Sequence, residues 1–217
     1  MVYARDVGNR RLEFAVSGML WNRSLVMIDL QTETLWSHIL GKAMRGKLEG
    51  TVLDAIPCTM TSWEAWKRLR PNTTLIDLTR THQSYDKRFY RNLERFVFGW
   101  VDGEQASSVT LRVLRKHPVL NLTQNDKPLL VTYNPFSTAA RLFSRRIQDY
   151  ELQFSPEGTA AMRDRQTGSL WNRSSGIAEE GPLQGTSLEP LVGIMSFKNT
   201  WKTFHPSSRS IGPKDVR

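Results

Sequence analysis

The most basic stretch of the chain lies within residues 74–95, where cationic and aromatic side chains alternate irregularly. Arginine and lysine neutralise phosphates, while aromatic rings stack on bases, so this composition is typical of a polyanion-binding segment. The candidate contacts for an anionic partner are Arg80, Lys87, Arg88, Arg91 and Arg95. The same composition fits a solvated connector whose rings pack onto neighbouring lobes. The sequence therefore leaves two interpretations: a nucleic-acid or polyanion site over residues 80–95, and a basic linker.

Other residues with chemical potential each have a structural interpretation as well. His117 is the candidate metal ligand, but it precedes Pro118 in a strand-like context that is typical of a structural histidine. Cys58 has no neighbouring His/Asp pattern that would activate a thiolate, so we expect a small buried hydrophobe. Asp29 and Asp164 each precede a turn, where a carboxylate ordinarily accepts hydrogen bonds from turn amides. The sequence contains no HExxH, GxSxG or complete phosphate-loop motif. It indicates no catalytic constellation and no particular cofactor.

A long internal repeat must position these residues. Residues 29–71 align without a gap with residues 164–206, and the alignment pairs Trp36 with Trp171 and Trp66 with Trp201. Aromatic, glycine and proline positions in common register indicate a duplicated structural unit. Residues 1–14 align similarly with residues 141–154, but the second copy has a preceding segment, residues 96–140, that the first lacks. We therefore expect the first copy to be incomplete at its N-terminus.

The repeat predicts a mainly β protein, a β-rich α+β fold of two related lobes that each end in one short helix. The expected division is an incomplete first repeat (1–73), a basic linker (74–95), a second repeat (96–206) and a flexible tail (207–217). Hairpins are expected over residues 1–16 and between residues 25–29 and 34–38, with further strands over 51–58, 96–100, 109–114 and 129–133. A capping box from Thr61 to Glu64 predicts the first helix, which Pro71 ends.

Composition limits the function classes. The chain has 217 residues, a net charge of +9 and one cysteine, so an intrachain disulfide is excluded and an anionic partner is favoured. No apolar run approaches the roughly 20 residues of a transmembrane helix. The N-terminus lacks the apolar region of a signal peptide. An incomplete first repeat leaves room for an upstream signal, so the compartment stays open.

Three motifs carry a family resemblance. They are VSGMLWNRSLVMIDLQTETLW, the G-x-A-x-x-G-x-L-x-G pattern of residues 41–50, and the T-x-W-x-x-W-x-x-x-x-P ending at Pro71. Over residues 12–71, and more loosely over 96–206, the chain resembles the bacterial and archaeal domain of unknown function 3179 family. Family members carry a histidine followed by a CPLC motif. His117 occupies the histidine position, but Asn134, Pro135, Phe136 and Ser137 stand at the CPLC position, so both cysteines are missing. The resemblance implies an architecture and no mechanism.

Three functions remain as hypotheses. The first is a non-catalytic β protein that binds a ligand or partner between its lobes. The second is a fragment of a metal-binding or redox protein whose His/CPLC site lies upstream of Met1, because thiolates and imidazole suit zinc or copper. The third is binding of nucleic acid or another polyanion through residues 80–95.

Overall fold

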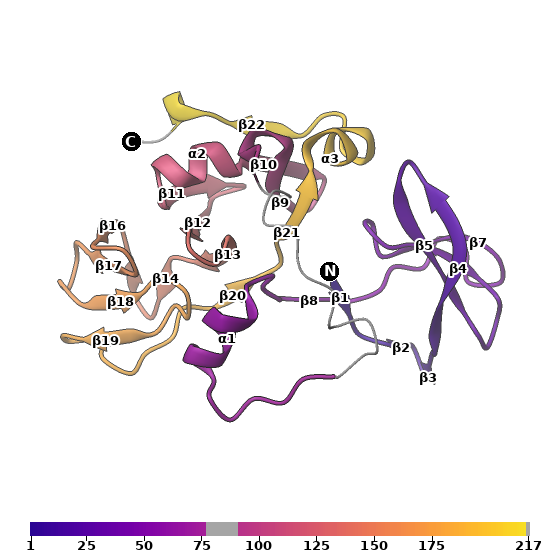
Figure 1. Cartoon of the computed structure of the whole chain (residues 1–217), viewed down its shortest axis with the longest axis horizontal. Helices are drawn as coiled ribbons and strands as arrows, with labels where there is room; N and C mark the ends of the chain where they lie inside the picture. Colours follow the sequence, from indigo (N-terminus) through magenta and orange to yellow (C-terminus); the bar gives the residue numbers. More distant parts are fainter. Residues whose placement is uncertain (77–90, 216–217) are drawn as a thin grey trace.

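The computed structural model of the chain describes residues 1–76 and 91–215 and shows a β-rich protein with short helices (Figure 1). The predicted fold class, mainly β, is confirmed. We refer to residues 1–76 as the first half and to residues 91–215 as the second half. The first half consists of short strands and ends in a helix: β1 Val2–Tyr3, β2 Asp6–Val7, β3 Arg10–Arg11, β4 Phe14–Trp21, β5 Ser24–Asp29, β6 Leu35–Ser37, β7 Lys42–Arg45, β8 Ala55–Ile56 and α1 Trp63–Leu69.

The second half begins with elements that have no equivalent in the first. These are the 3₁₀ turn η1 Leu93–Arg95, β9 Phe96–Asp102, β10 Gln105–Thr110, α2 Leu111–Lys116, β11 Val119–Gln124 and β12 Lys127–Asn134. A series that repeats the first half follows: β13 Ala139–Ser144, β14 Arg146–Ile147, β15 Tyr150–Glu151, β16 Phe154–Glu157, β17 Ala161–Asp164, β18 Leu170–Asn172, β19 Ala178–Glu180, β20 Pro190–Leu191 and α3 Lys198–Phe204. The strand β21 Ile194–Phe197, between β20 and α3, has no counterpart among the strands of residues 1–76. The strand β22 Arg209–Ile211 and the turn η2 Pro213–Asp215 complete the described chain.

The sheet topology reproduces the duplication. The antiparallel sheet β4-β5-β6-β7 corresponds to β16-β17-β18-β19, the ribbon β2-β3 corresponds to β14-β15, and the pair β1-β8 corresponds to β13-β20. In Figure 1 the sheet of the first half lies at one end of the molecule and that of the second half at the other. The predicted hairpin of residues 25–29 and 34–38 is confirmed as β5 paired with β6.

A buried carboxylate closes the corresponding turn in each half. Asp29 is 0 % exposed and accepts hydrogen bonds from the Thr32 backbone amide at 2.7 Å and the Trp36 indole Nε1–H at 2.9 Å. Asp164 makes the same bonds, to Thr167 at 2.6 Å and to Trp171 at 2.9 Å. The prediction that these aspartates bind turn amides is confirmed. Burial raises the pKa of Asp29, but the hydrogen bonds from Trp36 and Thr32 together outweigh it and hold the pKa below its ordinary value.

The largest core belongs to the strands that only the second half has. It joins aromatic and aliphatic side chains from β9, α2 and β12, among them Phe98, Trp100, Leu114 and Tyr133. Strand β9 pairs with β10 through the turn that follows Asp102, and its other edge pairs with β21. The four-stranded sheet β21-β9-β10-β22 that results carries α3 on one end.

Several sequence predictions were wrong in detail. Residues 109–114 were expected as a strand, but α2 begins at Leu111, because Leu111 and Leu114 are three residues apart and both buried, and Thr110 accepts the Val113 amide as N-cap. Residues 207–217 were expected as a flexible tail, yet β22 pairs in parallel with β10 and buries Ile211 to 5 % exposure.

The first half also differs from its predictions. Residues 1–16 do not form one hairpin: β2 and β3 make a two-residue ribbon, whereas β1 pairs with β8 far along the chain. Residues 51–58 form a strand only at β8. The α1 helix is capped by Ser62, whose hydroxyl accepts the Ala65 amide, and not by the Thr61–Glu64 box, because Glu64 binds Arg68 one turn along the helix.

The aspartate clamp generates a prediction about stability. Replacing Asp29 with Asn puts an amide donor against either the Trp36 indole N–H or the Thr32 amide, so one buried donor loses its partner. We expect the free energy of unfolding to fall by about 2 kcal/mol, measured by urea denaturation at neutral pH. The control Asp54→Asn lies on the surface and should change it by less than about 0.5 kcal/mol. Equal stability of the two variants would show that the clamp contributes nothing.

Candidate functional site

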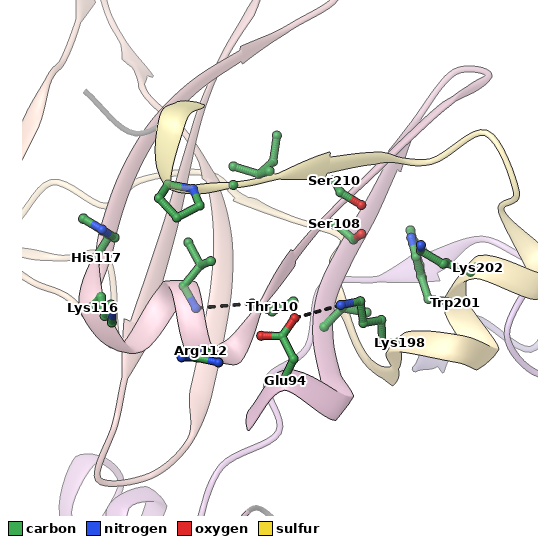
Figure 2. A pocket seen from close by; sticks show the side chains of 15 residues that line it. Glu94, Ser108, Thr110, Arg112, Lys116, His117, Lys198, Trp201, Lys202 and Ser210 are labelled. Atoms are coloured by element: carbon green, nitrogen blue, oxygen red, sulfur yellow. Dashed lines mark hydrogen bonds and ion pairs between the residues drawn. The ribbon is translucent and has the colours of Figure 1, made fainter. Parts of the chain in front are cut away.

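A cavity of about 470 Å³ lies between α2, α3 and β22 in the second half (Figure 2), and we call it the cationic cleft. Its walls come from both helices, the two central strands and the chain that follows β22. The lining residues are Glu94, Val97, Ser108, Thr110, Arg112, Val113, Lys116, His117, Lys198, Trp201, Lys202, Ser210, Ile211, Gly212 and Pro213.

The α2 helix supplies one cationic wall. Its buried positions Leu111 and Leu114 fix the face that packs on the core, which leaves Arg112 and Lys116 exposed one helical turn apart. His117 ends the helix as its C-cap residue, and its backbone N–H donates to the Val113 carbonyl. In Figure 2 Lys116 and His117 lie together at one end of the cleft.

The α3 helix supplies the opposite wall and is held by Trp201. This side chain is 1 % exposed, and its indole Nε1–H donates to the Ser208 hydroxyl at 2.8 Å. The ring lies so close to Gly99 of β9 that a Cβ at that position would come within 2.7 Å of it. With Trp201 fixed, Lys198 and Lys202 flank it at the i−3 and i+1 positions and line the cleft.

The floor of the cleft is apolar and carries two hydroxyls. Val97 and Ile211 are 2 % and 5 % exposed, and both line the cavity. Because β22 pairs in parallel with β10, Ser210 lies directly opposite Ser108. Figure 2 shows the two serine side chains next to each other on adjacent strands.

The charges around the cleft are unbalanced. Glu94 is the one carboxylate among the described lining residues, and it accepts a hydrogen bond from Lys198 Nζ at 2.8 Å. Within residues 1–76 and 91–215, no ion pair involves Arg112, Lys116 or Lys202. Each helix therefore carries two cations four residues apart, a spacing at which like charges destabilise a helix by about 0.2–0.5 kcal/mol.

The corresponding helix of the first half has a different charge pattern. In α1, Glu64 and Arg68 form a favourable ion pair four residues apart. Trp63 and Lys67 occupy the positions that Lys198 and Lys202 have in α3. The like-charge pair of α3 is therefore not a requirement of the repeated scaffold.

Two further cavities adjoin α3. One of about 700 Å³ shares Glu94 and Lys198 with the cationic cleft and adds Arg23 and Arg95. Arg23 reaches it because Trp21, two residues earlier, packs edge-on against Phe204 of α3 with ring centroids 4.8 Å apart. The other cavity, of about 460 Å³, lies between the halves, where Tyr3 and Leu40 face Val192 and Trp201.

Two of the five residues predicted as a polyanion site, Arg91 and Arg95, lie in the described part of the chain. Arg80, Lys87 and Arg88 lie outside the described residues. Arg91 is exposed, and Arg95 lines the cavity next to the cationic cleft.

The metal and thiol candidates also have defined places. His117 lies in the wall of the cationic cleft. In the described part of the chain, no group of three His, Cys, Asp or Glu side chains is arranged to hold a metal. Cys58 is exposed, contrary to the buried position expected for it. Its partner in the repeat is Gly193, where a Cβ would come within 2.3 Å of the Phe98 ring. Residues 1–76 contain no strand equivalent to β9, so no such ring restricts the side chain of Cys58.

Sequence reasoning missed Arg112, Lys116, Lys198 and Lys202. The expectation of a strand over residues 109–114 hid the first pair, because that strand ends before Lys116 and so leaves Arg112 and Lys116 on no common element, whereas α2 carries both. The R-x-x-x-K and K-x-x-x-K spacings were the signal that was available.

The fold and cleft define a β-rich protein built from an unequal duplication, with a cation-lined cavity in its larger half. The chain belongs to the family described as Protein of unknown function (DUF3179), whose profile matches residues 1–98 and again residues 92–214. This confirms the resemblance carried by the sequence motifs. No curated protein and no solved structure matches the chain. None of the described helices has the length and apolar character needed to cross a membrane.

Proposed function

We propose that this protein binds a small anion with an apolar body in the cationic cleft. The observation that carries the proposal is the set of three cations, Arg112, Lys116 and Lys202, that surround an apolar floor and have no ion pair within the described residues. A carboxylate, phosphate or sulfonate group satisfies the cations, and an aliphatic or aromatic body covers the floor.

The dimensions and composition of the cleft support this ligand class. A volume of about 470 Å³ lies within the range of about 300–1,000 Å³ that is typical of small-molecule pockets. Such pockets combine apolar walls with a few polar groups that fix orientation. Here the apolar wall consists of Val97, Trp201 and Ile211, while the hydroxyls of Ser108 and Ser210 are available as neutral donors.

Each charged residue has a distinct role in the proposal. Arg112 and Lys116 stand on one wall and Lys202 on the other, so an anionic group between them receives donors from two helices. Lys198 is already bound to Glu94 and closes the cleft between the helices. The anion also relieves the like-charge repulsion within α2, because it places a negative charge beside both members of the pair.

The experiment is a fluorescence titration with 8-anilinonaphthalene-1-sulfonate, competed with decanoate and with the uncharged decanol at matched ionic strength. We expect decanoate to displace the probe far better than decanol. The double variant Arg112→Gln/Lys116→Gln should bind decanoate at least about tenfold more weakly, equivalent to about 1.4 kcal/mol.

The matched control is Arg115→Gln/Lys67→Gln, which removes two exposed helical cations outside the cleft. It leaves decanoate affinity unchanged if the cleft is the site. Equal weakening in both double variants would mean that overall charge attracts the anion, and equal displacement by decanol would place the probe in an apolar site. Either result overturns the proposal.

A longer polyanion is the second candidate function. The observation that favours it is the adjoining cavity of about 700 Å³, which is lined by Arg23 of the first half and Arg95 of the second. Lys198 lines both this cavity and the cationic cleft. An extended phosphate backbone lying across both cavities meets cations from both halves.

This candidate predicts a salt-dependent affinity for a single-stranded oligonucleotide of about 16 nucleotides. Affinity should fall steeply between about 50 and 200 mM salt, and Arg23→Gln/Arg95→Gln should reduce the slope against salt by about 1.4, as expected for two lost phosphate contacts. Fluorescence anisotropy measures both quantities. Absence of binding at the lower salt concentration would eliminate this candidate and leave the small anion.

A further inference from the structure

A fourth cavity, of about 730 Å³, lies between α1 of the first half and the β12–β13 turn of the second, and we call it the α1 cavity. Helix α1 lines it with Ser62, Glu64 and Arg68, while Ser137 and Arg141 line it from the turn and from β13. In Figure 1, α1 lies away from the β4-β5-β6-β7 sheet of its own half. The α1 cavity shares no lining residue with the cationic cleft.

Arg141 is an unusual residue within this cavity. Its Nε atom is shielded from solvent and has no hydrogen-bond partner, and within the described residues its side chain makes no ion pair. Arg141 as a whole is partly exposed, but a shielded donor without an acceptor is costly. The Nε–H of Arg141 therefore lacks a hydrogen-bond acceptor within the described residues, and a ligand oxygen would supply one.

The neighbouring Arg145 shows how this chain satisfies a buried guanidinium. Arg145 is 3 % exposed and donates to the carbonyl oxygens of Leu129 at 2.9 Å, Leu152 at 2.6 Å and Leu122 at 3.1 Å. It also lies 3.5 Å from a carboxylate oxygen of Glu151. Arg141 and Arg145 are four residues apart, yet each guanidinium nitrogen of Arg145 has an acceptor, whereas the Nε of Arg141 has none within the described residues.

The charges around Arg141 reinforce the contrast. Burial and then the nearby positive charge of Arg70 lower the pKa of Arg141. Arg173 is 2 % exposed, and its shielded Nε likewise has no hydrogen-bond partner within the described residues. This arginine lies near Arg141 in the fold, because its backbone carbonyl accepts a hydrogen bond from the Thr132 hydroxyl, and Thr132 pairs with Arg141 across β12 and β13. Among the described residues that line the α1 cavity, Glu64 is the one carboxylate, and it already binds Arg68.

Neutral donors complete the surroundings. The Ser62 hydroxyl accepts from the Ala65 amide, and the Ser174 hydroxyl accepts from Asn134 at 3.3 Å, so each retains its own proton to donate. Ser137 is 3 % exposed and also lines the cavity. Hydroxyls and a guanidinium that line one cavity form a donor set that suits a tetrahedral oxyanion.

From this arrangement we infer that the α1 cavity is a phosphate-binding site in which Arg141 is the principal donor. The volume exceeds that of a phosphate group, so a small phosphate ester fits as well as the free ion. Because α1 and β13 come from different halves, the bound phosphate holds the two halves together.

The test measures the thermal midpoint of the whole chain in chloride, in inorganic phosphate and in ribose 5-phosphate, at matched ionic strength, with ribose as the uncharged control. Saturating phosphate should raise the midpoint of the unaltered protein by about 5 °C. Arg141→Met should lose this rise, and its midpoint in chloride should equal or exceed that of the unaltered protein, because an uncompensated cation has been removed. A larger rise with ribose 5-phosphate identifies an ester as the better ligand.

Two matched variants locate the effect. Arg146→Met makes the same change on the neighbouring strand β14, where the side chain is exposed, and should keep the full response. Arg112→Gln should also keep it, because neither inorganic phosphate nor ribose 5-phosphate has the apolar body that the cationic cleft requires. A response that survives Arg141→Met, or that disappears with Arg112→Gln, contradicts the inference.

A measurement on the unaltered protein covers a failure of Arg141→Met to fold. Phosphate should shift the ¹⁵N–¹H resonance of a slowly exchanging arginine Nε–H, and the same resonance should be absent from Arg141→Lys. A titration that leaves every arginine Nε–H resonance unmoved contradicts the inference.

Discussion

The packing of Trp201 against Gly99 is the contact on which the candidate site depends. The indole fills the space that any side chain at position 99 would need, since a Cβ there would come within 2.7 Å of the ring. The ring thereby fixes α3 against β9, and its hydrogen bond to Ser208 directs the following chain toward β22. Lys198, Lys202, Ser210 and Ile211 reach the cationic cleft as a consequence. The repeat places Trp66 at the same position in the first half, where it bonds to Thr73 but remains partly exposed.

The two halves share their local geometry and differ in what covers it. The aspartate clamp is the same in both, because it depends only on residues within one short hairpin. Arg5 and Arg145 occupy the same position in the repeat, yet Arg5 is exposed whereas Arg145 is buried against β11 and β12. The same residue type at corresponding positions of the repeat is thus exposed in one half and buried in the other, because the first half has no described strands equivalent to β9–β12.

Much of the architecture was predictable from the sequence. The duplication, the β class, the paired hairpins and both terminal helices follow from residue identities in register, since such patterns act over a few residues. The cationic cleft was not predictable, because it combines α2, α3 and a parallel strand near the C-terminus that are distant in sequence. Arg141 was equally hidden, since whether an arginine finds acceptors is decided by tertiary contacts and not by its neighbours in the chain.

One electrostatic asymmetry characterises the cationic cleft: cations gather on an apolar floor beside the single carboxylate among its described lining residues, and the anion that we propose restores the balance. A crystal structure of the protein with bound 8-anilinonaphthalene-1-sulfonate tests this most directly. The account predicts the sulfonate within hydrogen-bonding distance of Arg112 or Lys116, with the rings against Trp201 and Ile211. Rings bound in the cavity between the halves, with the cationic cleft free of the sulfonate, would contradict it.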